Sequence, residues 1–139
     1  MKKISNLLLF LMTLTALSTL QTAHAQSSDS DEPSDKARVY LYRPKSPVGM
    51  AVIYTVFIDD RQVGIAKNGF NTIYEVSEAK EIEIWGETEK KMSLNLKVEP
   101  GNDYFVKCAV KMGALTGRPK FTLETIEKGK RSYNKLIKD

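Results

Sequence analysis

The sequence predicts an all-β fold, a predominantly antiparallel β-sandwich of about seven to eight strands. From Ala37 onward, short runs rich in Val, Ile, Tyr, Phe and Thr alternate with Gly, Pro, Asn and Asp, which is typical of strands joined by turns. Before residue 127, no helical period extends beyond a turn or two. Most candidate strands are apolar on one side, so two packed sheets are the natural way to bury them.

The first 25 residues have the pattern of a cleavable signal peptide. Lys2 and Lys3 give a positive start, residues 7–17 form an apolar stretch, and Ala23 and Ala25 are the small residues that a signal peptidase reads. Thr and Ser interrupt the apolar run, which falls short of the roughly 18 residues of a membrane span. We therefore expect cleavage after Ala25, a periplasmic or secreted product, and no transmembrane segment after cleavage. No cysteine stands near the cleavage region for a lipid anchor.

Residues 26–36 read QSSDSDEPSDK, and this composition predicts a disordered acidic linker because it holds no apolar residue to repay ordering. The β-sandwich domain is expected over residues 37–127. A basic C-terminal tail, residues 128–139, is expected to follow.

In the first half of the domain, residues 38–42 form a strand that ends before an Arg-Pro pair. Residues 52–58 are apolar on both parities, which predicts a central strand covered on both sides. Asp59 and Asp60 begin a tight turn into residues 63–66.

Asn68-Gly69 is the strongest hairpin dipeptide in the chain, because both residues tolerate the positive φ of a type I′ turn. It predicts a hairpin into a strand over residues 70–76.

The second half alternates more cleanly, with strands expected over 80–87, 92–98, 103–111 and 121–126. Between the second and third of these, Pro100 and Gly101 stand where a type II turn requires them. The residues that strand parity turns inward are Ile82, Ile84, Met92, Leu94, Leu96, Val98, Tyr104, Val106, Cys108 and Val110.

The C-terminal tail carries a helical stripe made of Tyr133, Leu136 and Ile137, but so short a helix is not stable alone. It either docks on the domain or frays. From Arg118 onward, the chain has seven Lys or Arg residues and three acidic residues. This basic end is either a solubilising tail or a weak attachment to anionic envelope polymers through residues 128–138. Nucleic acid is not expected as a partner, because no aromatic residues interleave with the charges.

Composition also restricts catalysis. His24 is the chain's only histidine and lies in the segment expected to be removed. A mature protein without histidine cannot use Ser-His-Asp or Cys-His catalysis, histidine metal sites or histidine bases. We therefore expect no enzyme, no metal and no cofactor. The alternative is an enzyme that uses carboxylate or lysine chemistry without histidine.

Other chemistry-bearing residues have simpler explanations. Strand parity turns Cys108 into the core, where a thiol behaves as a small hydrophobe. Glu81 and Glu83 share a strand face about 7 Å apart, which a glycosidase pair would permit but any half-exposed strand also shows. Asp59 and Asp60 have too few oxygens for a calcium loop, and turn formation explains them.

Two features could mark a binding surface. Trp85 stands on the polar parity of its strand, and Tyr40 and Tyr42 share the parity of Arg38. If they cluster outside, they form an aromatic, mixed-charge patch of the kind that grips a protein or a glycan. The alternative is that a loop or the C-terminal tail covers them.

Four segments, taken in order, resemble a known family. They are ARVYLYRP (37–44), YTVFIDDRQVG (54–64), NGF (68–70) and PGNDYFVK (100–107). The chain resembles the domain-of-unknown-function family 2846, exported bacterial proteins that are often lipoproteins, over roughly residues 37–126. More distantly it is similar to immunoglobulin-like, surface-layer-type sandwich modules. The resemblance implies a fold and a compartment but no activity, and the missing lipidation cysteine departs from the lipoprotein members.

Together these observations predict an exported, non-catalytic module of the envelope or the medium, an accessory or binding domain. Its expected partner is an envelope protein or a glycan.

Overall fold

The computed structural model describes residues 35–139. The predicted signal peptide (1–25), with its His24, lies outside the described residues. So does the predicted linker (26–36), apart from its last two residues.

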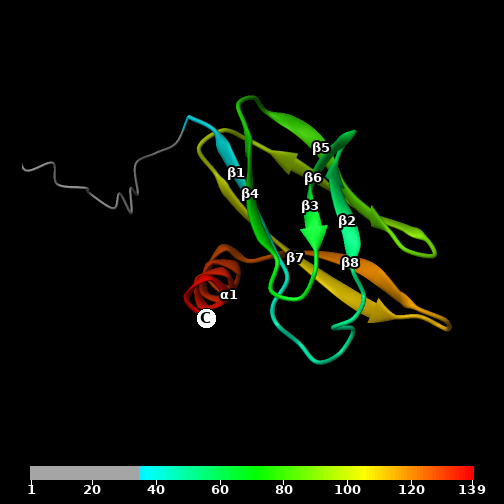
Figure 1. The fold of residues 1–139 in the computed structure, drawn as a ribbon. Coiled ribbons are helices and arrows are strands. Elements are labelled where there is room, and N and C mark those ends of the chain that lie inside the picture. Colours follow the sequence, from blue (N-terminus) through cyan, green and yellow to red (C-terminus); the bar gives the residue numbers. More distant parts are fainter. Residues whose placement is uncertain (1–34) are drawn as a thin grey trace, which may run out of the picture. The chain divides into compact units, whose positions relative to one another are not determined.

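The described chain forms eight strands and one helix, which confirms the predicted all-β class (Figure 1). The strands make two four-stranded sheets, which we call sheet A (order β4-β1-β7-β8) and sheet B (order β3-β2-β5-β6). In chain order the elements are β1 (Ala37–Tyr42), β2 (Tyr54–Ile58), β3 (Arg61–Ala66), β4 (Asn71–Val76), β5 (Lys80–Glu87), β6 (Lys91–Val98), β7 (Asp103–Met112), β8 (Gly117–Glu124) and α1 (Ile126–Lys138).

Neighbouring strands are antiparallel throughout, with the exception of β1 and β7, which run parallel. Arg38 lies opposite Asp103 in that pair, and its guanidinium donates two hydrogen bonds to the carboxylate, at 2.8 and 3.0 Å. A two-pronged contact of this kind fixes one register. The sandwich is therefore predominantly antiparallel, as predicted, with one parallel pair that local patterns did not reveal.

The Asn68-Gly69 turn links the two sheets, so the predicted hairpin is wrong. The strand before it, β3, belongs to sheet B, and the strand after it, β4, belongs to sheet A. The Phe70 amide donates to the Lys67 carbonyl at 3.0 Å, and within this turn only Gly69 has a positive φ, of 83°. One positive φ at the third position fits a type II turn, whereas a type I′ hairpin needs two.

The core lies between the inner faces of the two sheets, and strand alternation fills it as predicted. On β5, Ile82 and Ile84 are buried while Glu81 and Glu83 face outward. Met92, which parity turned inward, is 36% exposed near the start of the edge strand β6. The buried core residues are Ala37, Val39, Leu41, Tyr54, Val56, Ile58, Ala66, Val76, Ile82, Ile84, Leu96, Val98, Val106 and Cys108.

The strand β2 is central in its sheet, as predicted, but only its inner face is covered. Tyr54, Val56 and Ile58 are buried, whereas Phe57 on the outer face is half-buried. Ile53, just before the strand, is 58% exposed. The prediction of cover on both sides is wrong, because the helix packs on the other sheet.

The helix α1 docks on the outer face of sheet A, so of the two expected fates of the tail, docking is the one observed (Figure 1). Tyr133 forms a buried aromatic cluster with Tyr42 and Phe105. Gly129 permits this approach, since a Cβ at that position would lie 2.1 Å from the Cβ of Phe105.

The strand β8 starts and ends earlier than the predicted 121–126. It begins at Gly117 and includes Pro119, which an edge strand tolerates because a missing N–H can face away from the ladder.

Candidate functional site

The centre of the candidate site is Arg43, the first residue after β1, which is only 3% exposed. Its guanidinium donates hydrogen bonds to three backbone carbonyls, at 2.6 Å to Gly49, 2.6 Å to Val52 and 2.7 Å to Ala66. Two of these acceptors belong to the connecting loop (residues 43–53), which carries the chain from sheet A to sheet B. The hydrogen bonds of Arg43 therefore hold this loop around the Arg43 side chain.

The charge of Arg43 has no local counter-ion. Among residues 35–139, no carboxylate lies within 4.0 Å of its guanidinium. Carbonyl dipoles accept hydrogen bonds from three of its five N–H groups, but they do not cancel a full positive charge. The Tyr54 ring adds a cation–π contact, with 6.0 Å from the guanidinium carbon to the ring centroid. A buried cation thus remains as a source of positive potential beside the loop.

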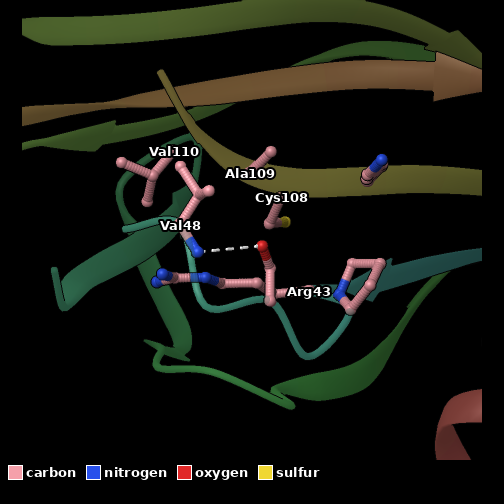
Figure 2. Close-up of a pocket in the computed structure, with 8 residues that line it drawn as sticks. Arg43, Val48, Cys108, Ala109 and Val110 are labelled. Carbon is pink, nitrogen blue, oxygen red and sulfur yellow. Dashed lines mark hydrogen bonds between the residues drawn. The ribbon is translucent and has the colours of Figure 1, made fainter. Parts of the chain in front are cut away.

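A first cavity of about 240 Å³ opens next to Arg43, between the connecting loop and β7. In Figure 2, Arg43 and Val48 face Cys108, Ala109 and Val110 across it. The dashed bond in that view runs from the Val48 amide to the Ser46 hydroxyl, at 3.2 Å.

Cys108 belongs to the core, as strand parity predicted. It is fully buried, and burial raises the pKa of its thiol to about 12. Its sulfur lies 3.8 Å from the Val106 carbonyl oxygen. A thiol that holds its proton to so high a pH is not a nucleophile at neutral pH.

A second cavity of about 410 Å³ adjoins the first and shares Pro44 and Lys107 with it. We call it the cationic cleft. It lies between the start of the connecting loop, β7 and the C-terminal part of α1, and three lysines line it. The residues of its wall are Pro44, Lys45, Lys107, Ser132, Lys135, Leu136 and Asp139. The sequence showed a basic end but not this site, because the three lysines are far apart along the chain.

Tyr40 and Tyr42 do not form an open patch, because α1 covers them. The Tyr40 ring stacks on Phe105 with centroids 4.6 Å apart, and Tyr133 meets Tyr40 and Tyr42 edge-on at 5.1 and 6.1 Å. Burial raises the pKa of both hydroxyls in this pair. The expectation that the tail covers these tyrosines is confirmed, and the alternative of an open patch there is wrong.

Trp85 lies on the outer face of sheet B and so cannot join the tyrosines, which face outward from sheet A. Its ring stacks on Phe57 of β2, with centroids 4.2 Å apart and planes 9° apart. From the other neighbouring strand, the Lys91 ammonium lies 4.6 Å from the ring centroid. Because β2 and β6 flank β5 on opposite sides, both faces of the indole have neighbours. Its Nε1 donates to the Asp59 carbonyl at 2.8 Å. Trp85 is therefore largely engaged within its own sheet.

The carboxylates that the sequence offered as candidate catalytic or calcium-binding groups have structural roles or are exposed. Glu83 pairs with Lys91 at 3.0 Å, and Glu81 is exposed on the same strand face. Asp59 has a φ of 50°, and its side chain accepts a hydrogen bond from the Glu83 amide at 2.9 Å. Asp59 and Asp60 thus form the predicted turn. In the described part of the chain, no group of three or more His, Cys, Asp or Glu side chains could hold a metal ion.

No helix among residues 35–139 has the length and apolar character to cross a membrane.

Fold and surface together define a small two-sheet β-domain with a C-terminal helix on one face and a lysine-lined cleft beside it. The chain belongs to the family described as "Protein of unknown function (DUF2846)", whose model matches residues 33–119. This confirms the family resemblance of the sequence motifs. The match spans both sheets as far as the beginning of β8.

A protein of Haemophilus influenzae described as "Uncharacterized protein" is similar to this chain. The two are 30% identical over 130 residues, which cover 88% of this chain and 76% of that protein. No solved structure matches the chain at a significant level.

Proposed function

We propose that the protein is exported and acts in the periplasm or outside the cell as a non-catalytic binding module for an envelope protein or a glycan. The cationic cleft is the observation that carries the binding role. It is a concave surface whose wall holds three lysines together with Pro44 and Leu136.

The signal-peptide pattern of residues 1–25 supports export. The experiment is mass spectrometry of the product purified from an expressing bacterium, with cell fractionation. We expect an N-terminus at Gln26 in the periplasmic or external fraction. An intact leader on a cytoplasmic product would overturn this part.

The positions of Glu81, Glu83 and Cys108 support a role without catalysis by these residues. A carboxylate enzyme needs its acid and base to converge on a substrate in a concave site. Glu81 and Glu83 instead stand on the outer face of a strand, and Glu83 is paired with a lysine. Cys108 is buried.

The second candidate function is weak attachment to anionic envelope polymers through residues 128–138. Lys128 is paired with Glu124 at 2.7 Å, one turn earlier, whereas Lys135 lines the cleft. Lys135 therefore gives the tail a charge in the cleft, while Lys130, Arg131 and Lys138 are exposed outside the cleft wall.

Co-sedimentation of the processed protein with a cell-envelope fraction tests the binding role. We expect binding that weakens with added salt, because it involves exposed charges. A variant with Lys45, Lys107 and Lys135 all changed to Ala should lose most of it, while Trp85→Ala should keep it. Absence of co-sedimentation at low salt, or equal loss in both variants, would count against the proposal.

A further inference from the structure

We propose that the cationic cleft binds a phosphate monoester group carried by an envelope glycan. This deepens the proposed function, on which it rests, by naming the ligand chemistry of the same cleft.

The first argument is convergence. Lys45 comes from the connecting loop, Lys107 from the middle of β7 and Lys135 from the last turn of α1. Lys107 lies opposite Tyr42 in the parallel pair and therefore on the face of sheet A that α1 covers. Three separate segments thus place lysines in the wall of one cavity, which a solvated basic tail would not do.

The second argument is charge. Among residues 35–139, no carboxylate lies within 4.0 Å of these three ammonium groups, although Lys91, Lys128 and other surface lysines have such partners. Arg43, behind the adjoining cavity, adds a buried cation without a counter-ion.

Two features oppose this charge. Asp139 contributes a carboxylate to the wall, and the C-terminal end of α1 carries the negative end of the helix dipole, about half a charge. The wall holds three lysine side chains against one acidic side chain, so the net formal charge of these side chains is positive.

The third argument is rigidity. The loop that carries Lys45 is held by the three Arg43 bonds and by the Ser46 amide, which donates to the Asn68 side chain at 2.9 Å. On its other side, β7 is hydrogen-bonded to strands at both edges. A site that is already ordered loses less freedom when a ligand binds.

These properties select a phosphate monoester. Its phosphate carries nearly two negative charges and three acceptor oxygens, and lysine binds such a group as a point charge. The volume of about 410 Å³ leaves room for an organic group beside the phosphate. Pro44 and Leu136 give that group apolar contacts, and Ser132 belongs to the same wall.

An NMR titration of the processed protein tests the inference, with glucose 1-phosphate, inorganic phosphate and glucose as probes. We expect saturable amide shifts around Lys45, Lys107 and Lys135 with glucose 1-phosphate. Inorganic phosphate should act at the same amides more weakly, and glucose should have no effect.

Charge variants then assign the site. Lys45→Ala and Lys135→Ala remove exposed side chains, so the fold is not at stake, and each should weaken binding about tenfold, as expected for a charge-assisted hydrogen bond. Lys130→Ala is the matched control, with the same charge change on an exposed position of α1 outside the cleft wall. It should leave affinity almost unchanged. Asp139→Asn should strengthen binding.

Several outcomes would overturn the inference. They are the absence of saturable shifts at these amides, an equal loss in Lys130→Ala, and inorganic phosphate binding as tightly as the sugar phosphate. If envelope co-sedimentation persists while this titration fails, the phosphate ligand is refuted and the binding module stands.

Discussion

At the scale of single residues, Arg43 is the position on which both the connecting loop and the adjoining cavity depend. Replacing it with Met would remove one donor from each of the carbonyl groups of Gly49, Val52 and Ala66, and of these Gly49 keeps the bond from the Val52 amide. We expect Arg43→Met to lower the free energy of unfolding by about 2 kcal/mol or more, since each buried acceptor that loses its donor costs about 1 kcal/mol at least. Urea denaturation measures this.

Arg61→Met is the matched control for that variant, because Arg61 is exposed. It should change stability by less than about 0.5 kcal/mol. Equal effects of the two substitutions would show that Arg43 does not organise the loop.

The buried thiol of Cys108 makes stability depend on alkaline pH. Burial raises its pKa from 9.0 to about 12, so between these values the unfolded state has lost a proton that the folded state still holds. The contribution of this group to the free energy of unfolding is therefore fully present below pH 9. It falls as pH rises above 9, by at most about 1.4 kcal/mol per pH unit. Urea titrations across that range should show a shallower decline for Cys108→Ala. Burial also raises the pKa of Tyr54, so some decline should remain. Identical slopes would contradict the prediction.

Single residues also show which features the sequence could predict and which it could not. Cys108 could be placed in the core because parity is a local property of one strand. Arg43 could not be identified as a buried hub, because its three acceptors come from the connecting loop and from the end of β3. The cleft has the same origin, since Lys45, Lys107 and Lys135 meet only after the sheets and the helix have packed.

At the scale of elements, the docking of α1 depends on a glycine. A Cβ on Gly129 would meet the Cβ of Phe105, which is fixed to the backbone and cannot rotate away. We expect Gly129→Ala to destabilise the protein by about 1–3 kcal/mol, although alanine favours a helix by about 1 kcal/mol. Thermal unfolding and near-UV circular dichroism of the tyrosine cluster measure the loss.

Lys130→Ala provides the reference for that substitution, since it changes the next residue of α1 on its exposed side. It should leave the aromatic signal intact. A Gly129→Ala protein more stable than the parent would mean that the helix does not pack as closely as described.

The strands could be predicted more fully than their partners. Local sequence patterns predicted all eight strands, with β8 beginning four residues before the predicted start, because such patterns depend on neighbouring residues alone. The parallel pairing of β1 and β7 joins residues that are 65 positions apart, so no local sequence pattern predicts it. For the same reason Asn68-Gly69 predicted the turn correctly, but the strands on its two sides do not pair with each other as a hairpin requires.

At the scale of the whole molecule, both sheets contribute to one core, so they should unfold together. Trp85, the single tryptophan, reports on sheet B by fluorescence, while Tyr40, Tyr42 and Tyr133 report on sheet A by near-UV circular dichroism. We expect the two urea transitions to coincide, as in a two-state domain. Separate midpoints would show that the sheets are independent units.

The parallel pairing of β1 and β7 has a consequence for the order in which a growing polypeptide can acquire this fold. All four strands of sheet B lie within residues 54–98, whereas sheet A joins β1 to strands that are synthesised last. A chain that emerges N-terminus first can thus complete one layer early, but the interior stays open to water until the segment after residue 102 has emerged.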